Sequence, residues 1–228
     1  QYDGTPLSAH LTCKTGPRRI SLASAAGDTI ERGHKWSANI AYWGANICRA
    51  AWVGENEADL PPAARDYIEV FAGPYFAAMV QWLQSLALDA NCGPIHDATL
   101  AALPYEMFHL ELNPGHHIGY DEWPNSPFFP GSTVRLQSGM VLQSDVIPSH
   151  PVYFSARLEE GYALADANLR RELAELYPAS WARITARREL LANRLGIHLN
   201  EAVLPLSNTS GLMAPFALAP ERVFINAS

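Results

Sequence analysis

Residues 113–148 read NPGHHIGYDEWPNSPFFPGSTVRLQSGMVLQSDVIP. This stretch holds two adjacent histidines between glycines, and three acids follow them: Gly115, His116, His117, Gly119, Asp121, Glu122 and Asp145. Glycine lets the backbone approach a ligand closely or adopt a positive φ. Histidines and carboxylates together are the side chains that build a metal site or an acid–base site. We therefore expect the rest of the chain to act as a scaffold for this stretch.

The composition is that of an ordinary folded protein. The 228 residues are enough for one sizeable core, and with 48% hydrophobic and 17% charged residues the chain is not of the disordered class. A formal charge of −7 argues against a nucleic-acid partner, because phosphate binding needs clustered Lys and Arg. No apolar run reaches the roughly 18 residues that a membrane-spanning helix requires. We expect a single domain over residues 1–228, with neither nucleic acid nor membrane as a partner.

The three cysteines, Cys13, Cys48 and Cys92, lie far apart among apolar or small residues. An odd number without CxxC spacing indicates buried free thiols in a reducing compartment. The expected location is therefore the cytoplasm.

Hydrophobic periodicity and turn residues predict the order of the elements. Residues 1–34 are loop-rich, with one short strand candidate at 20–23. A hairpin over 35–53 turns near 43–46, and a helix over 63–88 is kinked or split at Pro74. A second helix over 95–103 precedes six strand candidates: 105–112, 116–120, 132–136, 140–146, 152–157 and 162–165. Two helices at 169–177 and 180–195 follow, capped by Asp166 and Gly196, before a tail over 200–228 that we expect to lie on the surface. Helices and strands grouped in this way favour an α+β protein with an antiparallel sheet.

Three interpretations of the central stretch remain open on the residues alone. The first is a metal site formed by His116, Asp145 and Glu159. The second is metal-free acid–base chemistry by a histidine that a carboxylate tunes, either Glu122 or Glu159. In the third, the histidines bond to backbone carbonyls and the acids pair with two arginines, Arg135 and Arg157. The sequence has no GxSxG, Walker or GxGxxG motif, which argues against nucleophilic-triad and nucleotide-binding proteins.

Three segments together resemble consecutive signatures of a known superfamily. They are GHHIGYDEWP (115–124), SGMVLQSDVIP (138–148) and ARLEEGYALAD (156–166). In this order and spacing they are similar to the pita-bread superfamily, which includes methionine aminopeptidase, prolidase, aminopeptidase P and creatinase. Upstream, GHKWSAN (33–39) and YWGANICRAAWVG (42–54) look like its two aspartate-bearing segments.

The resemblance implies the pita-bread fold, a curved antiparallel sheet with helices on its outer face. Residues 1–34 would form a loop-rich start, 35–166 the core and 167–228 a helical C-terminal extension. The superfamily's earlier helices would lie before Gln1, so the N-terminal part of the fold is expected to be missing from this sequence. Its relatives often form dimers, and the helix over 63–88 has apolar surface to offer, so we expect a homodimer.

The resemblance also implies a ligand set of two Asp, one His and two Glu for two metal ions. The matching positions are Asn39, Asn46, His116, Asp145 and Glu159. Two of the acids are thus asparagines, and a neutral amide binds a hard divalent ion more weakly than a carboxylate does. A further histidine of the peptidases is replaced by Trp123. We therefore expect either no metal or a single divalent ion (Mn, Zn, Co or Fe), and not a dinuclear centre.

The leading functional hypothesis is a creatinase- or Xaa-Pro-peptidase-like hydrolase of a small substrate with a C–N bond: an amide, a dipeptide or a guanidino compound. His116 would carry a proton or bind the ion, and Glu159 or Asp145 would be the base that orients water. The substrate-binding residues would be Asn39, Asn46, Glu122 and Trp123. One alternative is a non-catalytic protein that keeps the pocket for binding or assembly, and another is a true dimetal aminopeptidase.

Overall fold

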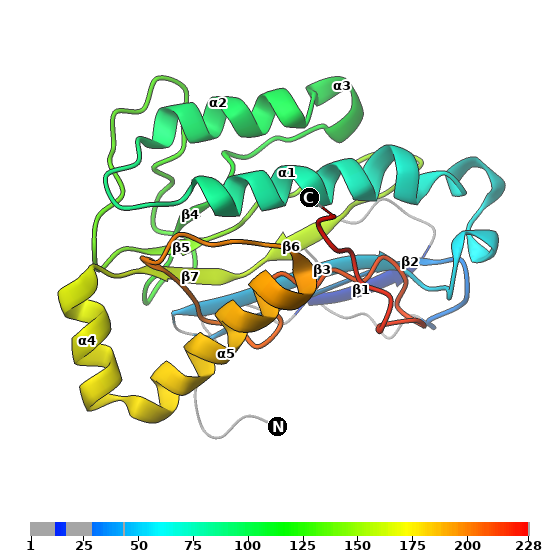
Figure 1. Ribbon diagram of the computed structural model, residues 1–228. Coiled ribbons are helices and arrows are strands. Elements are labelled where there is room, and N and C mark those ends of the chain that lie inside the picture. The colour runs from blue at the N-terminus through cyan, green and yellow to red at the C-terminus, as the bar shows by residue number, and fades with distance from the viewer. Residues whose placement is uncertain (1–11, 17–28, 43, 228) are drawn as a thin grey trace.

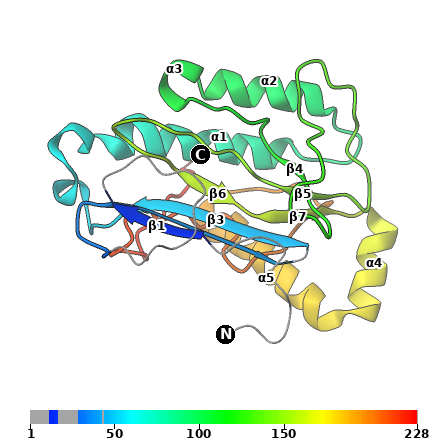
Figure 2. The ribbon, with the colours of Figure 1, turned by 180° about the vertical axis from the view of Figure 1, so that it is seen from behind.

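Two four-stranded antiparallel sheets form the centre of the protein, seen from opposite sides in Figures 1 and 2. A computed structural model describes residues 12–16, 29–42 and 44–227. The first sheet has the order β1-β2-β3-β6 and the second the order β4-β5-β7-β8. The strands are β1 (Thr12–Gly16), β2 (Lys35–Tyr42), β3 (Ala45–Trp52), β4 (His116–His117), β5 (Val141–Gln143), β6 (Arg157–Glu159), β7 (Gly161–Leu164) and β8 (Val203–Pro205).

Five α-helices accompany the sheets in the described part of the chain: α1 (Gly73–Ser85), α2 (Cys92–Ala102), α3 (Tyr105–Phe108), α4 (Ala167–Leu176) and α5 (Pro178–Leu195). Short turns of helix precede α1, at Glu57–Asp59, Pro62–Ala64 and Ile68–Ala72. In both ribbon views α1, α2 and α3 lie on one side of the strands and α5 lies on the other (Figures 1 and 2). The helices predicted at 95–103, 169–177 and 180–195 are confirmed within a few residues. None of the helices among the described residues has both the length and the apolar character needed to cross a bilayer.

The hairpin predicted over 35–53 is confirmed as β2 and β3. Its register places Ala41 opposite Asn46, and Asn39 opposite Cys48. Residues directly opposite in an antiparallel pair share a face, and residues two apart on one strand also share it. Asn39, Asn46 and Cys48 therefore point to one side of the sheet, and Arg49 points to the other.

The helix predicted over 63–88 is confirmed in its central part, and its aromatic stripe is core. The turns at Ile68–Ala72 are π-helical, and α1 begins at Gly73 with Pro74 in its first turn. Proline has no N–H to donate, and it fits the first turn of a helix, where that group has no intrahelical partner. The helix is thus split next to Pro74 in its hydrogen bonding, which changes from π-helical to α-helical at Gly73, while the backbone stays helical. Large buried side chains from this region fill the core: Tyr67, Phe71, Tyr75, Met79, Trp82 and Leu83.

Of the six predicted strands, 162–165 is confirmed as β7, 116–120 and 140–146 are confirmed only as the shorter β4 and β5, and the other three are wrong or shortened. In place of the strand expected at 105–112, Tyr105–Phe108 form the short helix α3, because Pro104 begins it and His109, with φ of 44°, ends it in the left-handed region. Residues 132–136 form only an isolated bridge between Arg135 and Asn91. The strand predicted over 152–157 begins only at Arg157, after a turn that contains Phe154 with φ of 70°. The candidate at 20–23 lies outside the described residues.

The expectation that residues 200–228 lie on the surface is wrong. Residues Val203–Pro205 form β8, which pairs with β7 and extends the second sheet. Further along, the side chains of Met213 and Phe216 are buried in the main hydrophobic core. Ala202, Val203 and Leu204 are also buried, whereas Leu206, Leu218 and Ile225 stay exposed, so the tail is partly core and partly surface.

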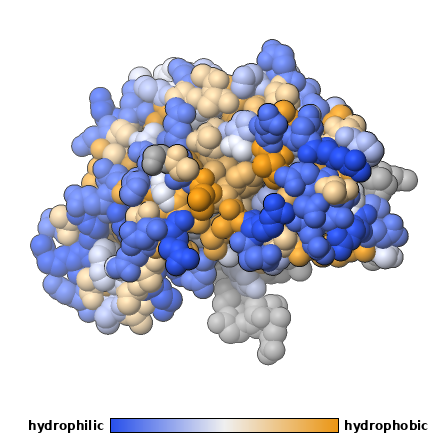
Figure 3. Space-filling view, turned by 45° about the vertical axis from the view of Figure 1, so that its right-hand side comes forward, coloured by the Kyte–Doolittle hydropathy of each residue, from blue (hydrophilic) through white to orange (hydrophobic). Residues whose placement is uncertain are grey.

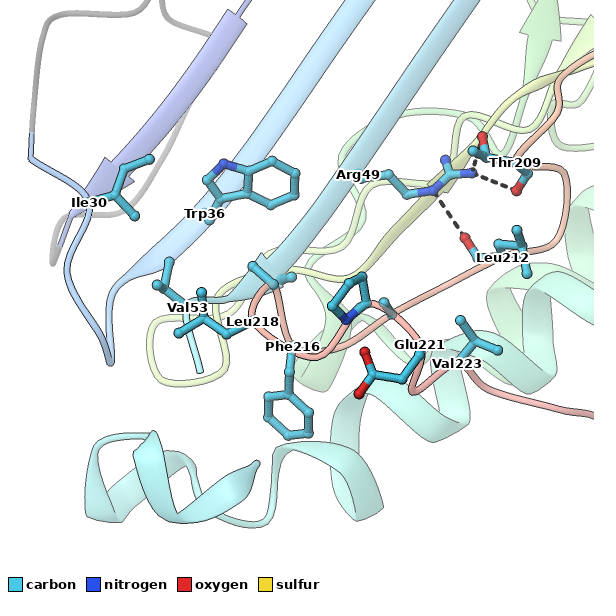
Figure 4. A pocket seen from close by; sticks show the side chains of 14 residues that line it. Ile30, Trp36, Arg49, Val53, Thr209, Leu212, Phe216, Leu218, Glu221 and Val223 are labelled. Atoms are coloured by element: carbon cyan, nitrogen blue, oxygen red, sulfur yellow. Dashed lines mark hydrogen bonds between the residues drawn. The ribbon is translucent and has the colours of Figure 1, made fainter. Parts of the chain in front are cut away.

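A groove of about 700 Å³ lies on the side of the hairpin to which Arg49 points. Figure 3 shows hydrophobic residues gathered near the middle of one face of the molecule, and Figure 4 shows the residues that line the groove. Trp36 and Val53 contribute from the hairpin, and Phe216 and Leu218 contribute from the C-terminal segment. The groove is mostly apolar. Titratable side chains converge on the opposite face, so we place the candidate functional site there.

Candidate functional site

Strand register brings the candidate residues together. Asn39 on β2 lies opposite Cys48 on β3, and Cys48 lies opposite Glu159 on β6, so these three form one row across the first sheet. In the second sheet, His116 on β4 lies opposite Gln143 on β5. Hydrogen bonds from the Gln143 side chain to Asn46 and Glu159 then link the second sheet to the first.

His116 directs one ring nitrogen, Nε2, toward two carboxylates. Its side chain is fully buried, and its Nδ1 lies 2.8 Å from the carbonyl oxygen of His117. A carbonyl only accepts, so Nδ1 carries a proton and donates it, which leaves Nε2 as the nitrogen that faces the site. Nε2 lies 3.4 Å from Glu122 Oε1 and 3.6 Å from Asp145 Oδ2, and it has no hydrogen-bond partner among the described residues. A ring held in this way directs Nε2 to exchange a proton with the carboxylates or, when that nitrogen is unprotonated, to bind a metal.

Asn46 joins two of the carboxylates. Its Nδ2 donates to Glu122 Oε1 at 3.0 Å and also to Glu159 Oε1. Gln143, which is fully buried, donates to the backbone oxygen of Asn46 at 2.7 Å and lies 3.4 Å from Glu159 Oε1. The carboxylate of Glu159 is therefore held by two amide groups, one from each sheet.

The carboxyl groups of Glu122, Asp145 and Glu159 lie close together in the site. Burial raises the pKa of Glu159 well above its usual value, and the charges of Asp145 and Glu122 raise it further, against the opposing effect of Arg157. Burial also raises the pKa of Asp145 to about 6, although the positive charge of His116 opposes the shift. Negative charges that are crowded and removed from water favour the binding of either a proton or a cation.

The residues fit one divalent ion better than two. Single ligand atoms of His116, Glu122 and Glu159 all lie within 4.8 Å of one another. Several buried oxygens nearby have no hydrogen-bond partner in the described part of the chain: Asn39 Oδ1, Asn46 Oδ1, Gln143 Oε1 and Asp145 Oδ1. One nitrogen and two carboxylates suit one first-row ion. A second ion would need the charge that Asn39 and Asn46 lack.

The other two predicted site residues, Trp123 and Asn39, lie on the same side of the sheet as His116 and Glu159. Trp123 is half exposed, and its ring centroid lies 5.8 Å from that of His116. Asn39 shares the face of the row, and its Oδ1 is buried. The third interpretation of the sequence expected the histidines to bond to backbone carbonyls, and His116 does so. The expected pairing of the acids with Arg135 is wrong, because Arg135 donates to the backbone oxygen of Asp89.

Sequence reasoning missed two residues of the site, Gln143 and Cys48. Gln143 stands two residues before Asp145, a spacing that puts both on one face of a strand and could have indicated it. Cys48 is a buried free cysteine, as predicted, and Arg157 Nη1 lies 3.4 Å from its sulfur. Burial raises the pKa of the Cys48 thiol to about 12, so the thiol stays protonated at neutral pH.

Gly115 sets the position of His116, and a side chain there is expected to be costly. Its φ is +95°, and an added Cβ would lie 2.7 Å from Trp82 Cζ2 and 2.9 Å from Gln143 O. We expect Gly115→Ala to lower the free energy of unfolding by about 2–3 kcal/mol, measured by urea denaturation. Gly119→Ala is the matched control, because nothing lies within 4 Å of its added Cβ. Equal losses for the two variants would contradict the prediction.

Comparisons with known proteins bear on the fold. The chain matches no protein-family model, and it matches none of the curated protein sequences. Solved structures do match. A prolidase from Pyrococcus horikoshii has a TM-score of 0.57 at 17% identity, covering 69% of this chain and 45% of that one. An X-Pro aminopeptidase from Thermotoga maritima has a TM-score of 0.58 at 17% identity, covering 72% and 46%. A prolidase from Thermococcus sibiricus has a TM-score of 0.57 at 20% identity, covering 70% and 43%.

This chain thus spans less than half the length of each of these proteins. Sequence identities this low show similarity of the backbone fold alone. The expected fold is confirmed. The chain has the pita-bread fold of the prolidases and X-Pro aminopeptidases.

Proposed function

We propose that the protein is a hydrolase of small substrates with a C–N bond, similar in its chemistry to creatinase or to Xaa-Pro peptidases, and that it holds at most one divalent ion. The substrate would be an amide, a dipeptide or a guanidino compound. The observation that carries the proposal is the buried Nε2 of His116, which faces the carboxylates of Glu122 and Asp145 without a hydrogen-bond partner among the described residues. The fold shared with prolidases and X-Pro aminopeptidases supports it.

Hydrolysis of a C–N bond needs a base for the attacking water and a proton for the departing nitrogen. Asp145 suits the first role, because a carboxyl group with a pKa of about 6 is ionised at neutral pH but still takes up a proton. Glu159 suits the second role, since its raised pKa favours the protonated form. His116 Nε2 accepts a proton in transit or binds the ion. An ion bound there would polarise the substrate and lower the pKa of a water molecule.

The roles of the remaining residues follow from their contacts. Trp123, half exposed beside His116, would form one wall of the substrate site. Asn39 would offer its amide to a polar group of the substrate. Asn46 was expected to do the same. Its amide already donates to Glu122 and Glu159, so we assign Asn46 to holding these carboxylates in place.

One observation favours a second candidate, a non-catalytic protein that keeps the pocket for binding. The amide of Asn46 joins Glu122 to Glu159 and so partly satisfies the two carboxylates without any ion. A site whose carboxylates are satisfied without an ion can be stable in a protein that binds a ligand and does not catalyse a reaction.

The test is a substrate panel combined with metal analysis. Protein purified without chelator is analysed for Mn, Zn, Co and Fe, then assayed before and after chelation against Xaa-Pro and other dipeptides, amides and guanidino compounds. We expect turnover of at least one class and no more than one equivalent of metal. Absence of turnover in every state would favour the binding protein. Two equivalents of metal would contradict the single-ion site.

A further inference from the structure

Glu122 lies in the loop between β4 and β5, away from the strand positions that the superfamily resemblance marks as ligands. It was expected to touch substrate. In the structure its side chain turns inward, with about a quarter of its surface exposed, and its Oε1 lies 3.4 Å from His116 Nε2. Its neighbour Asp121 is exposed. Glu122 thus brings a carboxylate into the site from a position that is not among the metal ligands implied by the superfamily resemblance.

The geometry favours Glu122 over Asp145 as an ion ligand. The group whose ligand atoms all lie within 4.8 Å of one another contains His116, Glu122 and Glu159, and Asp145 does not belong to it. The side chain of Asp is one methylene shorter than that of Glu, which limits how far Asp145 reaches across the site. The fully buried His116 Nε2, which has no hydrogen-bond partner in the described part of the chain, points toward this group.

We propose that Glu122 is a direct ligand of the single divalent ion, together with His116 and Glu159, and that it replaces charge lost at the two asparagine positions. The inference rests on the site of the proposed function but not on its turnover. Ion binding can be measured directly, so the two can fail separately.

Asn46 is the residue that must respond when an ion enters. Its Nδ2 now lies between the carboxylates of Glu122 and Glu159, where a hydrogen-bond donor satisfies them. The same amide has a buried Oδ1 that lacks a hydrogen-bond partner within the described residues. Rotation of the amide by half a turn would bring that oxygen toward the ion and remove the N–H groups from it. A carboxylate at this position would need no rotation.

The test is titration of the chelated and dialysed protein with MnCl₂ and with ZnCl₂ by isothermal titration calorimetry. We expect the unaltered protein to bind one equivalent of an ion, and Glu122→Gln to bind it at least about 10-fold more weakly. Glu122→Asp, which keeps the charge, should fall between the two. Asn46→Asp should bind at least about 10-fold more tightly, because it adds charge and leaves no N–H group facing the ion.

Asp121→Asn is the matched control, since it removes one charge from the adjacent exposed residue. Its affinity should stay within about twofold of the unaltered protein. Circular dichroism of each variant checks that it folds, and the increase in Tm at a fixed MnCl₂ concentration gives a second measure of binding. Equal affinity in Glu122→Gln and the unaltered protein would overturn the inference. So would the absence of any binding by the unaltered protein up to about 1 mM ion.

The outcomes separate this inference from the proposed function. Turnover that persists while Glu122→Gln binds the ion normally would sink the ligand assignment alone. Ion binding that depends on Glu122, in a protein without turnover on any substrate of the panel, would sink the hydrolase alone.

Discussion

Replacing Arg49 with methionine is expected to lower the free energy of unfolding by about 3–5 kcal/mol. The reason is its partner. Glu160 has no exposed surface, and its carboxylate pairs with the guanidinium of Arg49. Methionine keeps much of the volume of the arginine side chain but leaves the carboxylate buried without its cation. Removing one member of a buried ion pair costs more than the pair itself contributes, because the remaining charge stays out of water.

Arg49 also joins parts of the chain that are far apart in sequence. Its guanidinium donates to the backbone oxygens of Cys48 at 2.8 Å, Glu159 at 3.1 Å and Leu212 at 3.2 Å. A further bond reaches the backbone oxygen of Thr209 at 3.1 Å, and Figure 4 shows these contacts with the C-terminal segment. The variant is therefore expected to loosen the C-terminal segment and the end of β6 that carries Glu159.

Urea denaturation followed by circular dichroism measures this effect. The matched control is Arg32→Met. Arg32 pairs with Glu55 and Asp59 but is half exposed, so water screens both pairs and we expect a much smaller loss than for Arg49→Met. Adding Glu160→Gln to Arg49→Met should restore part of the stability, because it removes the stranded charge. Similar losses for Arg49→Met and Arg32→Met would show that the ion pair contributes little.

The elements that the sequence predicts well are those that local pattern determines. The hairpin of β2 and β3, the helix divided at Pro74 and the two helices capped by Asp166 and Gly196 all follow from periodicity and terminal residues. Asp166 accepts from the backbone N–H of Leu169, and Gly196 has φ of 69°, as such caps require. These features need no knowledge of distant parts of the chain.

The incorrect predictions concern segments whose conformation depends on contacts with distant parts of the chain. Residues 105–112 alternate as a strand does, but they have no strand partner in the described structure, and Pro104 starts a helix instead. The tail gains β8 only because β7 offers it a free edge. In the same way, the motif spacing placed His116 and Glu159 in one site, whereas the inward turn of Glu122 depends on a loop. Loop conformation is the least predictable feature of a single sequence.

Replacing His116 with asparagine is expected to lower kcat by about 10²–10⁴-fold on whichever substrate class the protein hydrolyses. The two ring nitrogens have different tasks. Nδ1 donates to the carbonyl of His117 and fixes the ring, while Nε2 faces Glu122 and Asp145. The amide nitrogen of asparagine can still donate to the carbonyl, but nothing in the variant replaces Nε2. Stability should therefore change little compared with activity.

The neighbouring histidine supplies the matched control for this prediction. The Nδ1 of His117 lies 2.8 Å from Asn125 Oδ1, and β4 directs successive side chains to opposite faces. His117→Asn should thus keep kcat within about twofold of the unaltered protein. A kcat of His116→Asn equal to that of His117→Asn would remove His116 from the catalytic machinery. A loss in His116→Asn that is confined to KM would instead assign it to substrate binding, because a group that acts only in the transition state changes kcat.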